Sequence, residues 1–473
     1  MILTKPLRLH PDRLFPSDPT TRDIARRLYA TVKDLPIVSP HGHTDPRWFA
    51  YDEPFANPAD LLIVPDHYVF RMLYSQGVRL DELGVPTIDG SATESDPRAI
   101  WHRFAANYHL FRGTPSRMWL DWVFAEAFGI DVRLEPETAD HYYDIIDAAL
   151  KTDAFRPRAL FERYNIEVIA TTEGPLDPLD HHRAIRQSGW GGKVVTAYRP
   201  DPVLDPDDPK FTDNVQRFCA MAGEDAGSYA GYLRAHEKRR ADFRAAGATS
   251  TDHGHPSAFT ANLPRAEIEA LYARVTTGPA TREEAEQFRG HMLTEMARMS
   301  IADGMVMQLH PGVHRNHNDA VRARFGRDKG ADIPTAGEFV QALKPLLDLY
   351  GNDPRLTLIL FTLDEDVYSR ELAPLAGHYP ALKLGPPWWF NDSPEGMRRF
   401  RERATETAGF YNTVGFNDDT RAFLSIPARH DVARRMDCGW LAQLVAEHRL
   451  EEDEAFDVAR ALAYDLVKAA YKL

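Results

Sequence analysis

Eight short apolar or β-branched segments recur along the chain, and each is a candidate for the near-continuous apolar kind of strand that parallel sheets use, although the fourth is small and polar and the seventh is brief. They are IVSPH (37–41), IEVIATT (166–172), KVVTAYR (193–199), GATSTD (247–252), MVMQLH (305–310), LTLILFT (356–362), ALKLGP (381–386) and TVGFND (413–418). Most are separated by segments with helical spacing of apolar residues, such as DPLDHHRAIRQSG and TAGEFVQALKPLLDLYG. Strands that alternate with helices in this way predict an α/β fold, a distorted (β/α)8 TIM-type barrel in which residues 1–473 form a single domain.

A long segment rich in aromatic residues separates the first two predicted strands. Its apolar residues have helical spacing, as in HRFAANYHLFRGTPSRMWLDWVFAEAFG. We therefore predict an inserted helical subdomain, residues 48–160, that packs over one side of the barrel mouth. At the other end of the chain, two amphipathic helices are predicted to close the domain.

Composition and charge narrow the class of protein. The chain of 473 residues is 43% hydrophobic, which is enough for one large core. Its net charge of −14 at pH 7 argues against nucleic-acid and anionic-membrane partners, so an anionic substrate would need local arginines. Cys219 and Cys438 are too few for a disulfide framework or a thiolate metal site, and no stretch is apolar over the thickness of a bilayer. We expect a cytoplasmic protein.

Two histidines follow the first predicted strand. His41 and His43 are separated only by Gly42, and residues two apart on a strand point to the same face. Both imidazoles would then project into the barrel mouth, an arrangement that suits zinc and similar divalent ions. The pattern alone is weak, because the chain holds 19 histidines and the same spacing recurs at His253 and His255. Two polar residues on a loop are the alternative interpretation.

Other strand ends carry groups that could complete a metal site. A carboxylate after the eighth predicted strand would lie beside the first strand in a closed barrel, and periodicity leaves both Asp418 and Asp419 open. The alternative is an aspartate that caps the next helix. His310, at the end of the fifth predicted strand, could be a ligand, a substrate-binding group or a hydrogen-bonded barrel residue.

Arginines and tryptophans also gather at predicted strand ends. Arg199, Arg315 and Arg421 stand where a guanidinium could hold a carboxylate in two parallel hydrogen bonds. A single arginine is more often a solvated surface charge, but three of them in an acidic protein predict an anionic small substrate. Trp388 and Trp389 could pack the rim or form an apolar wall against a sugar ring.

The stretch PDHYVFRMLYSQGV (65–78) predicts the start of a helix. Asp66 is the expected N-cap, with His67 and Tyr68 in the first turn. Tyr68 could pack in the core, or the phenol and the imidazole could reach toward the metal.

Together these motifs resemble the uronate isomerases, or glucuronate isomerases, of the amidohydrolase superfamily, and the likeness extends over nearly the whole chain. The family's H-x-H, D-H-Y, arginine before Pro-Asp, S-D-H and M-Q-L-H-x-G-x-x-R elements correspond to His41 and His43, Asp66–Tyr68, Arg199, Thr251–His253, and His310 with Arg315. The D-S-R-S-F-L-S signature is written DTRAFLS, which favours Asp419 over Asp418 and pairs it with Arg421. The T-T-D-D-P stretch reads TTEGP, so Glu173 and Gly174 depart from the family's two aspartates.

The resemblance implies aldose–ketose isomerisation of hexuronates, D-glucuronate to D-fructuronate and D-galacturonate to D-tagaturonate. It also implies one divalent metal ion, usually zinc, held by His41, His43 and Asp419. We predict proton transfer between C2 and C1 through an enediolate. The metal and Arg421 would handle the C1 and C2 oxygens, with Tyr68 or Asp419 as the proton shuttle. A direct hydride shift is the competing mechanism.

The remaining predicted residues hold the open-chain substrate. They are His67, which is also counted with the catalytic groups, together with Arg199, Asp252, His310, Arg315, Trp388 and Trp389. We expect a homo-oligomer that binds a small hexuronate as its substrate. The alternatives are a metal-dependent hydrolase of the same superfamily acting on a sugar-acid lactone, and a sugar-acid binding protein. The hydrolases generally add a sixth-strand histidine, which FTLDED lacks, and a binding protein would not need the complete ligand set.

Overall fold

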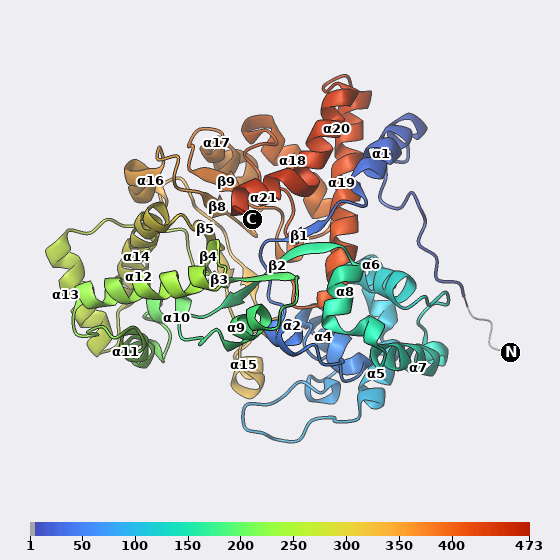
Figure 1. The fold of residues 1–473 in the computed structure, drawn as a ribbon, viewed down its shortest axis with the longest axis horizontal. Coiled ribbons are helices and arrows are strands. Elements are labelled where there is room, and N and C mark those ends of the chain that lie inside the picture. Colours follow the sequence, from blue (N-terminus) through green and yellow to red (C-terminus); the bar gives the residue numbers. More distant parts are fainter. Residues whose placement is uncertain (1–4) are drawn as a thin grey trace.

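A curled sheet of seven parallel strands forms the centre of the computed structural model, which describes residues 5–473 (Figure 1). The strands lie in the order β1-β2-β3-β4-β5-β8-β9, so chain order and spatial order agree, as in a TIM barrel. Their bounds are β1 Ile37–Ser39, β2 Ile166–Glu173, β3 Lys193–Tyr198, β4 Ser250–His253, β5 Val306–Leu309, β8 Leu358–Leu360 and β9 Leu382–Leu384. Seven of the eight predicted strands are therefore confirmed, several of them shorter than the apolar runs that predicted them.

The eighth predicted strand is wrong as a regular strand. Residues 413–418 pair with β9 only through a parallel bridge between Leu384 and Thr413. The chain then turns at Gly415, whose φ of 77° lies outside the extended region. A Cβ at this position would lie 2.6 Å from the carbonyl oxygen of Leu462. Glycine therefore permits a close backbone approach here, and the turn ends the pairing with β9.

The barrel is instead closed by a contact between two loops. The backbone amide of His43 donates a hydrogen bond of 3.0 Å to the carbonyl oxygen of Thr420. Gly42 also lies beside this carbonyl, since a Cβ built on it would be 3.4 Å from the oxygen, an ordinary van der Waals contact. The segment after residue 413 thus takes the eighth position of the barrel without a ladder of hydrogen bonds, and this makes the barrel distorted.

The inside of the sheet is filled by one apolar cluster. Val38, Val168, Ala170 and Val306 belong to it, whereas Ile169 belongs to the cluster beneath the helices around β1 and β2. Successive residues of a strand point to opposite faces, so this division follows from the period of two. The filled interior leaves only the carboxyl ends of the strands open to form a site.

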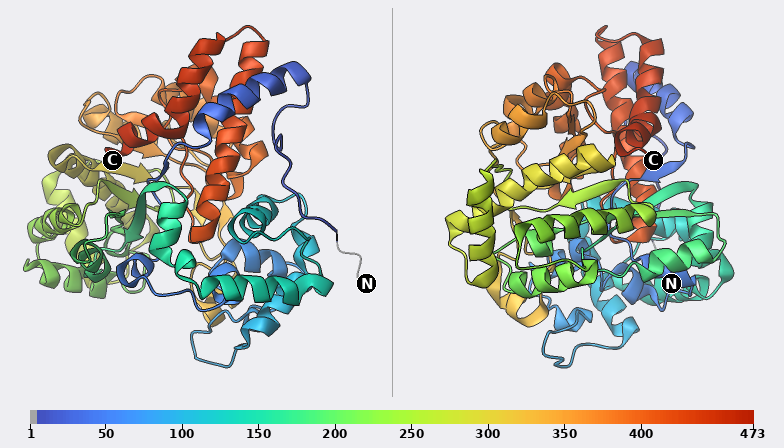
Figure 2. Two further views of the ribbon diagram at one scale, coloured as in Figure 1. Left: turned by 45° about the vertical axis from the view of Figure 1, so that its right-hand side comes forward. Right: turned by 60° about the vertical axis from the view of Figure 1, so that its left-hand side comes forward.

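Helices cover the outer face of the sheet, as the alternating sequence pattern predicts (Figures 1 and 2). They are α9 Asp180–Gln187, α11 Phe211–Ala222, α12 Tyr229–Ala245, α13 Arg265–Thr277, α14 Arg282–Asp303, α16 Lys344–Tyr350, α17 Ala373–Ala376 and α18 Pro394–Ala408, whereas α10 Asp201–Leu204 and α15 Asp319–Phe325 lie in the segments that follow β3 and β5. The chain ends in α19 Ile426–Ala446, α20 Glu452–Arg460 and α21 Leu466–Tyr471, and α1 Pro19–Val32 packs along α19. Leu28 and Val32 share a buried cluster there with Cys438 and Leu441.

The chain between β1 and β2 is helical. It forms α2 Pro46–Tyr51, α3 Pro58–Leu62, α4 His67–Tyr74, α5 Pro97–Ala106, α6 Pro115–Trp122, α7 Ala139–Leu150 and α8 Pro157–Arg163. Many of these helices begin with proline after a capping side chain, the arrangement that satisfies free amides at a helix start. Trp101 and Tyr108 of this segment share one buried cluster with Ile37 and Ile166 of the sheet. That residues 48–160 form a subdomain of their own stays a prediction.

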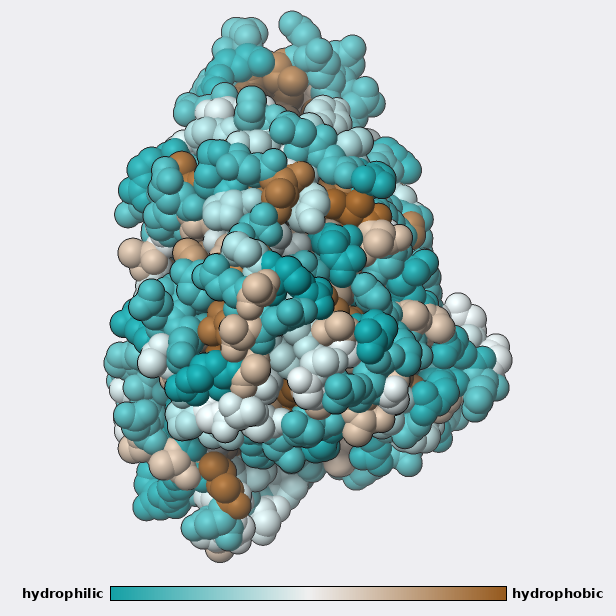
Figure 3. Space-filling model, turned by 90° about the vertical axis from the view of Figure 1, so that its left-hand side faces the viewer, coloured by the Kyte–Doolittle hydropathy of each residue, from teal (hydrophilic) through white to brown (hydrophobic). Residues whose placement is uncertain are grey.

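A small hairpin that the sequence did not predict lies beyond β5. It consists of β6 Val313–His314 and β7 Ile333–Pro334, which pair antiparallel around α15. Within residues 5–473, no helix combines the length and the apolarity needed to cross a membrane. The face that lies on the left in Figure 1 is mostly hydrophilic, with small apolar patches scattered over it (Figure 3).

Candidate active site

A cavity of about 360 Å³ opens at the carboxyl ends of the strands. This volume falls in the range of small-molecule sites. All twelve side chains that the sequence predicted for the site line it, namely His41, His43, His67, Tyr68, Arg199, Asp252, His310, Arg315, Trp388, Trp389, Asp419 and Arg421. The fold thus brings together residues from the two ends of the chain.

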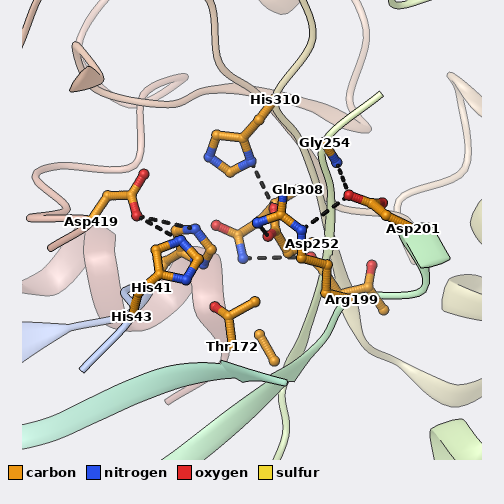
Figure 4. A network of polar contacts seen from close by, with 12 residues as sticks. His41, His43, Thr172, Arg199, Asp201, Asp252, Gly254, Gln308, His310 and Asp419 are labelled. Atoms are coloured by element: carbon orange, nitrogen blue, oxygen red, sulfur yellow. Dashed lines mark hydrogen bonds and ion pairs between the residues drawn. The ribbon is translucent and has the colours of Figure 1, made fainter. Parts of the chain in front are cut away.

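Two imidazoles and one carboxylate converge in this cavity. Nε2 of His43 lies 3.2 Å from Oδ1 of Asp419, and Nε2 of His41 lies 3.6 Å from the same oxygen (Figure 4). His41 is 1% exposed. The ligand atoms of the three residues lie within 4.8 Å of one another. Asp419 has a φ of 35°, which is rare for a residue with a side chain and places its carboxylate opposite the end of β1.

This trio fits a divalent cation. Nδ1 of His41 and Oδ1 of Asp419 are buried without a hydrogen-bond partner among the residues that the structure describes. Burial lowers the pKa of His43, which keeps the ring neutral as a ligand must be. Burial raises the pKa of Asp419, but the neighbouring His41 and His43 outweigh it, and the pKa lies well below its usual range. A set of two nitrogens and one oxygen suits zinc.

A second group of potential ligands overlaps with the first. It consists of His41, Asp252 and His310, all buried. The His310 ring is stacked between His41, at a centroid distance of 5.0 Å, and Phe361, at 4.1 Å. Its Nδ1 lies 2.8 Å from Oδ1 of Asp252, although the contact lacks the geometry of a hydrogen bond. His310 is therefore placed either to bind a cation with His41 or to contact substrate, as the sequence left open.

The three predicted arginines all line the cavity, each beside a carboxylate. Nη1 of Arg199 is 3.0 Å from Oδ2 of Asp252, and its Nε donates to Asp201 at 3.0 Å. Arg421 lies 3.3 Å from Asp328. These carboxylates balance the guanidinium charges, so an entering anion competes for groups that are already oriented.

Tyr68 and His67 reach the cavity from the start of α4. Asp66 caps this helix as predicted, because its side chain accepts a hydrogen bond from the backbone amide of Tyr68 at 2.8 Å. The two rings are stacked at a centroid distance of 4.6 Å, and Nε1 of Trp389 donates to Nε2 of His67 at 3.1 Å. Burial lowers the pKa of His67 to about 3 and raises that of Tyr68 well above its usual value. At neutral pH both groups are uncharged.

Comparison with known proteins agrees with this geometry. A model of the glucuronate isomerase family matches residues 19–471. The chain belongs to the glucuronate isomerase family. The uronate isomerase of Rhizorhabdus wittichii is 69% identical over 468 residues, which cover 99% of each chain.

Solved structures show the same relationship. The crystal structure of glucuronate isomerase from Caulobacter crescentus superposes with a TM-score of 0.97 at 63% identity, and covers 99% of this chain and 98% of its own. The uronate isomerase of Thermotoga maritima gives 0.91 at 26% identity, with coverage of 98% and 99%.

Of the two residues that depart from the family's T-T-D-D-P motif, only Glu173 lies on the outer side of β2. Glu173 is not part of the cavity lining; its carboxylate accepts hydrogen bonds from Thr171 and Thr196, and His182 lies 3.7 Å away. Burial raises the pKa of Glu173 to about 7. Gly174, by contrast, lines the cavity. The glutamate thus belongs to the packing between β2 and α9, which sequence reasoning could not separate from the site.

Sequence reasoning missed a buried ion pair behind Tyr68. Arg429 of α19 pairs with Asp392, and its guanidinium lies 3.5 Å from the ring centre of Trp119 and 5.3 Å from that of Tyr68. Burial outweighs the arginine and raises the pKa of Asp392 to about 7. Asp328 of the loop between β6 and β7 was also missed. Neither aspartate follows a predicted strand or stands in a spaced motif, so no sequence signal marked them.

Proposed function

We propose that this glucuronate isomerase family member interconverts aldohexuronates and ketohexuronates, D-glucuronate with D-fructuronate and D-galacturonate with D-tagaturonate. The observation that carries the proposal is the joint position of the His41, His43 and Asp419 trio and the arginines in one cavity. A cation site beside a positively charged wall suits a sugar acid, whose carboxylate and hydroxyl oxygens need both kinds of contact.

The substrate is held in its open-chain form. Arg199 and Arg315 would bind the carboxylate, since both line the cavity and a guanidinium offers two parallel donors. Asp252 and His310 would contact hydroxyl groups. Trp388 and Trp389, stacked at 5.0 Å with an angle of 5° between their planes, would form an apolar wall that keeps water from the reacting carbons.

His41, His43 and Asp419 would hold one divalent cation, which we propose is Zn²⁺. When bound, such an ion polarises the oxygens at C1 and C2 and so acidifies the proton on C2. Arg421 would donate hydrogen bonds to the same oxygens and stabilise the enediolate as its charge develops.

The hydrogen on C2 would move to C1 as a proton. A base removes it from C2 and the electron pair forms the enediolate; protonation at C1 and transfer of the O2 proton to O1 then give the ketose. The carboxylate of Asp419 is ionised and can accept a proton, whereas the neutral phenol of Tyr68 can donate one. We propose that these two side chains share the shuttle and that His67 orients the phenol through the ring contact described above.

The hydrolase alternative is not favoured. The segment after β8 supplies Phe361, whose ring packs on His310, where superfamily hydrolases generally carry a histidine. A crystal structure of a putative metal-dependent hydrolase from Lactobacillus casei superposes with a TM-score of 0.53 at 14% identity, a likeness that concerns the fold alone.

An activity assay tests the proposal. Purified protein, loaded with zinc or treated with a chelator, is incubated with D-glucuronate, D-galacturonate or candidate lactones, and the products are separated by chromatography. We expect ketohexuronate from the zinc-loaded protein alone and no lactone opening. Lactone hydrolysis would favour the hydrolase, and tight binding of hexuronate without turnover would favour a binding protein; either outcome contradicts the proposal.

The homo-oligomeric state and the cytoplasmic location stay predictions. Light scattering of the purified chain checks the oligomeric state. The expected result is a mass of at least twice 53.6 kDa, the mass of one chain.

A further inference from the structure

A third cluster of metal-binding side chains lies behind the wall of the cavity. It consists of Asp201, His253 and His255, which we call the β4 histidine cluster, and its ligand atoms lie within 4.8 Å of one another. Strand alternation explains its position, because Asp252 faces the cavity and the next residue, His253, faces the opposite side. Neither histidine of the cluster lines the cavity, whereas Asp201 does.

One polar atom of each residue in the cluster has no partner. Oδ1 of Asp201, Nδ1 of His253 and Nε2 of His255 are all buried and lack a hydrogen bond within residues 5–473. The two histidines are 0% and 5% exposed, so bulk water does not satisfy them. Burying polar atoms without partners is unfavourable, and here three of them converge on one place. A single bound cation would satisfy all three.

The donor set indicates a cation rather than further protein contacts. Nε2 of His253 lies 3.0 Å from Oγ1 of Thr251, and a proton donated to that hydroxyl leaves Nδ1 with a free lone pair. This is the way in which a second hydrogen bond orients a metal-binding imidazole. Burial also lowers the pKa of both rings, to about 3 for His253, so both are neutral.

The carboxylate of the cluster is fixed from the other side. Oδ2 of Asp201 accepts hydrogen bonds of 3.0 Å from Nε of Arg199 and from the backbone amide of Gly254 (Figure 4). Its other oxygen, Oδ1, is left facing His255, whose Nε2 lies 4.0 Å away. Tetrahedral zinc, with ligands at about 2.1 Å, holds ligand atoms about 3.4 Å apart, so a small rotation of the side chains completes the site.

We propose that the β4 histidine cluster binds a second divalent cation of the zinc type, separate from the cation held by His41, His43 and Asp419. Two imidazoles and one carboxylate, with the fourth position left to water, match the ligand preference of zinc. Asp201 also accepts a hydrogen bond from Arg199. An ion bound to Asp201 would therefore hold this carboxylate in place and, through it, the arginine that faces the substrate.

Metal counting on the full-length protein tests this inference. The protein is stripped with a chelator, dialysed against excess zinc and then desalted, and its zinc is measured by mass spectrometry. We expect two zinc ions per wild-type chain and one in His255→Asn. His182→Asn is the matched control, since His182 is equally buried with an unpartnered Nδ1 and lies outside both sites; it keeps two.

A second measurement covers the case in which the variant does not fold. Crystals of the wild-type protein soaked in zinc are measured at the zinc absorption edge. An anomalous peak between Asp201, His253 and His255 supports the proposal. A zinc count in His255→Asn that equals that of the wild type, or a map without this peak, overturns it. None of these results depends on isomerase activity, so the two proposals fail separately.

Discussion

Asp419 combines an unusual backbone conformation with a converging side chain. Its φ of 35° is strained for a residue with a Cβ, and such strain persists only where surrounding contacts hold it. The benefit is a carboxylate that meets His41 and His43 across the closing point of the barrel. The neighbouring Asp418 points elsewhere and accepts a hydrogen bond of 3.0 Å from His430.

These two aspartates provide a matched pair of variants. We expect Asp419→Asn to lose one zinc equivalent relative to the wild type and nearly all activity, because it removes the only charged ligand of the trio. Asp418→Asn should keep the full zinc content, although loss of the buried contact with His430 will lower its melting temperature. Elemental analysis after dialysis gives the count. Equal zinc contents in the two variants would remove Asp419 from the metal site.

Tyr68 is the residue whose chemical role can be tested by removing one atom. Tyr68→Phe should lower kcat by a factor on the order of 10²–10⁴, the usual contribution of a positioned proton donor, with unchanged zinc content. Tyr164→Phe is the control, since Tyr164 is a partly buried tyrosine outside the cavity, and its buried hydroxyl has no partner in the described part of the chain. Steady-state kinetics on D-glucuronate measure both. A near-normal kcat in Tyr68→Phe would show that the phenol takes no part.

Among single residues, the sequence predicted as part of the site those side chains that belong to recognisable motifs after strands. It did not find Arg429 and Asp392, because each is an ordinary charged residue of its segment, and only the fold joins them across 37 positions. It also could not separate Glu173 from the site, because neighbouring residues at the end of a strand face opposite ways and the motif covers both.

The strand β2 carries two buried or partly buried glutamates with opposite electrostatic surroundings. Burial raises the pKa of Glu173 to about 7, so the folded protein keeps a proton that the unfolded chain releases near pH 4.5. Stability therefore falls as pH rises from about 4.5 to 7, and the loss is complete above 7. Glu167 contacts Lys468 and Tyr464, which outweigh its burial and lower its pKa, so it stabilises the fold above its usual pKa.

Neutral variants of these glutamates should respond to pH in opposite ways. Glu173→Gln should be more stable than the wild type at pH 8, by up to about 3 kcal/mol, and should show little gain at pH 4.5. Glu167→Gln should be less stable than the wild type at pH 8. Thermal unfolding at both pH values gives the comparison. A gain for Glu173→Gln that is the same at both would show that its effect is one of packing rather than charge.

The segment that closes the barrel depends on glycine. Gly415→Ala should lower the free energy of unfolding by about 2–4 kcal/mol, because an alanine pays for the positive φ and its Cβ meets the Leu462 carbonyl. Gly223→Ala is the control; Gly223 has a similar φ of 66° but open space around it, so about 1 kcal/mol is expected. Urea unfolding measures both. Equal losses of unfolding free energy in the two variants would mean that the close approach at Gly415 adds nothing to the cost of the substitution.

Strands and helices could be predicted from the sequence where the local pattern of apolar residues alone determines which of the two forms. Most of the seven parallel strands are apolar runs that are buried on both faces, which is a property of the sequence itself. The run at 413–418 has a similar apolar pattern. Whether it forms a strand, however, depends on the turn at Gly415 and on the close approach of the Leu462 carbonyl, which comes from a distant part of the chain. The hairpin of β6 and β7 is only two residues per strand and leaves no periodic signal.

For the whole molecule, the order of strands and the location of the site follow from the alternation of strands and helices. A parallel barrel places the carboxyl ends of all its strands at one mouth, so residues 41 and 419 meet although they are far apart in sequence. The path of residues 48–160 could be predicted only as helical, because the way in which these helices share a core with β1 and β2 depends on contacts that no periodicity encodes.

The most direct test of the whole account follows the C2 hydrogen of the substrate. Zinc-loaded and chelator-treated protein are incubated with D-glucuronate in D₂O and observed by NMR. The account predicts that only the zinc-loaded protein forms D-fructuronate, and that one deuterium from solvent enters at C1. D-Glucuronate that stays unchanged with zinc-loaded protein would contradict the isomerase function, and a ketose without deuterium at C1 would contradict proton transfer in favour of a hydride shift.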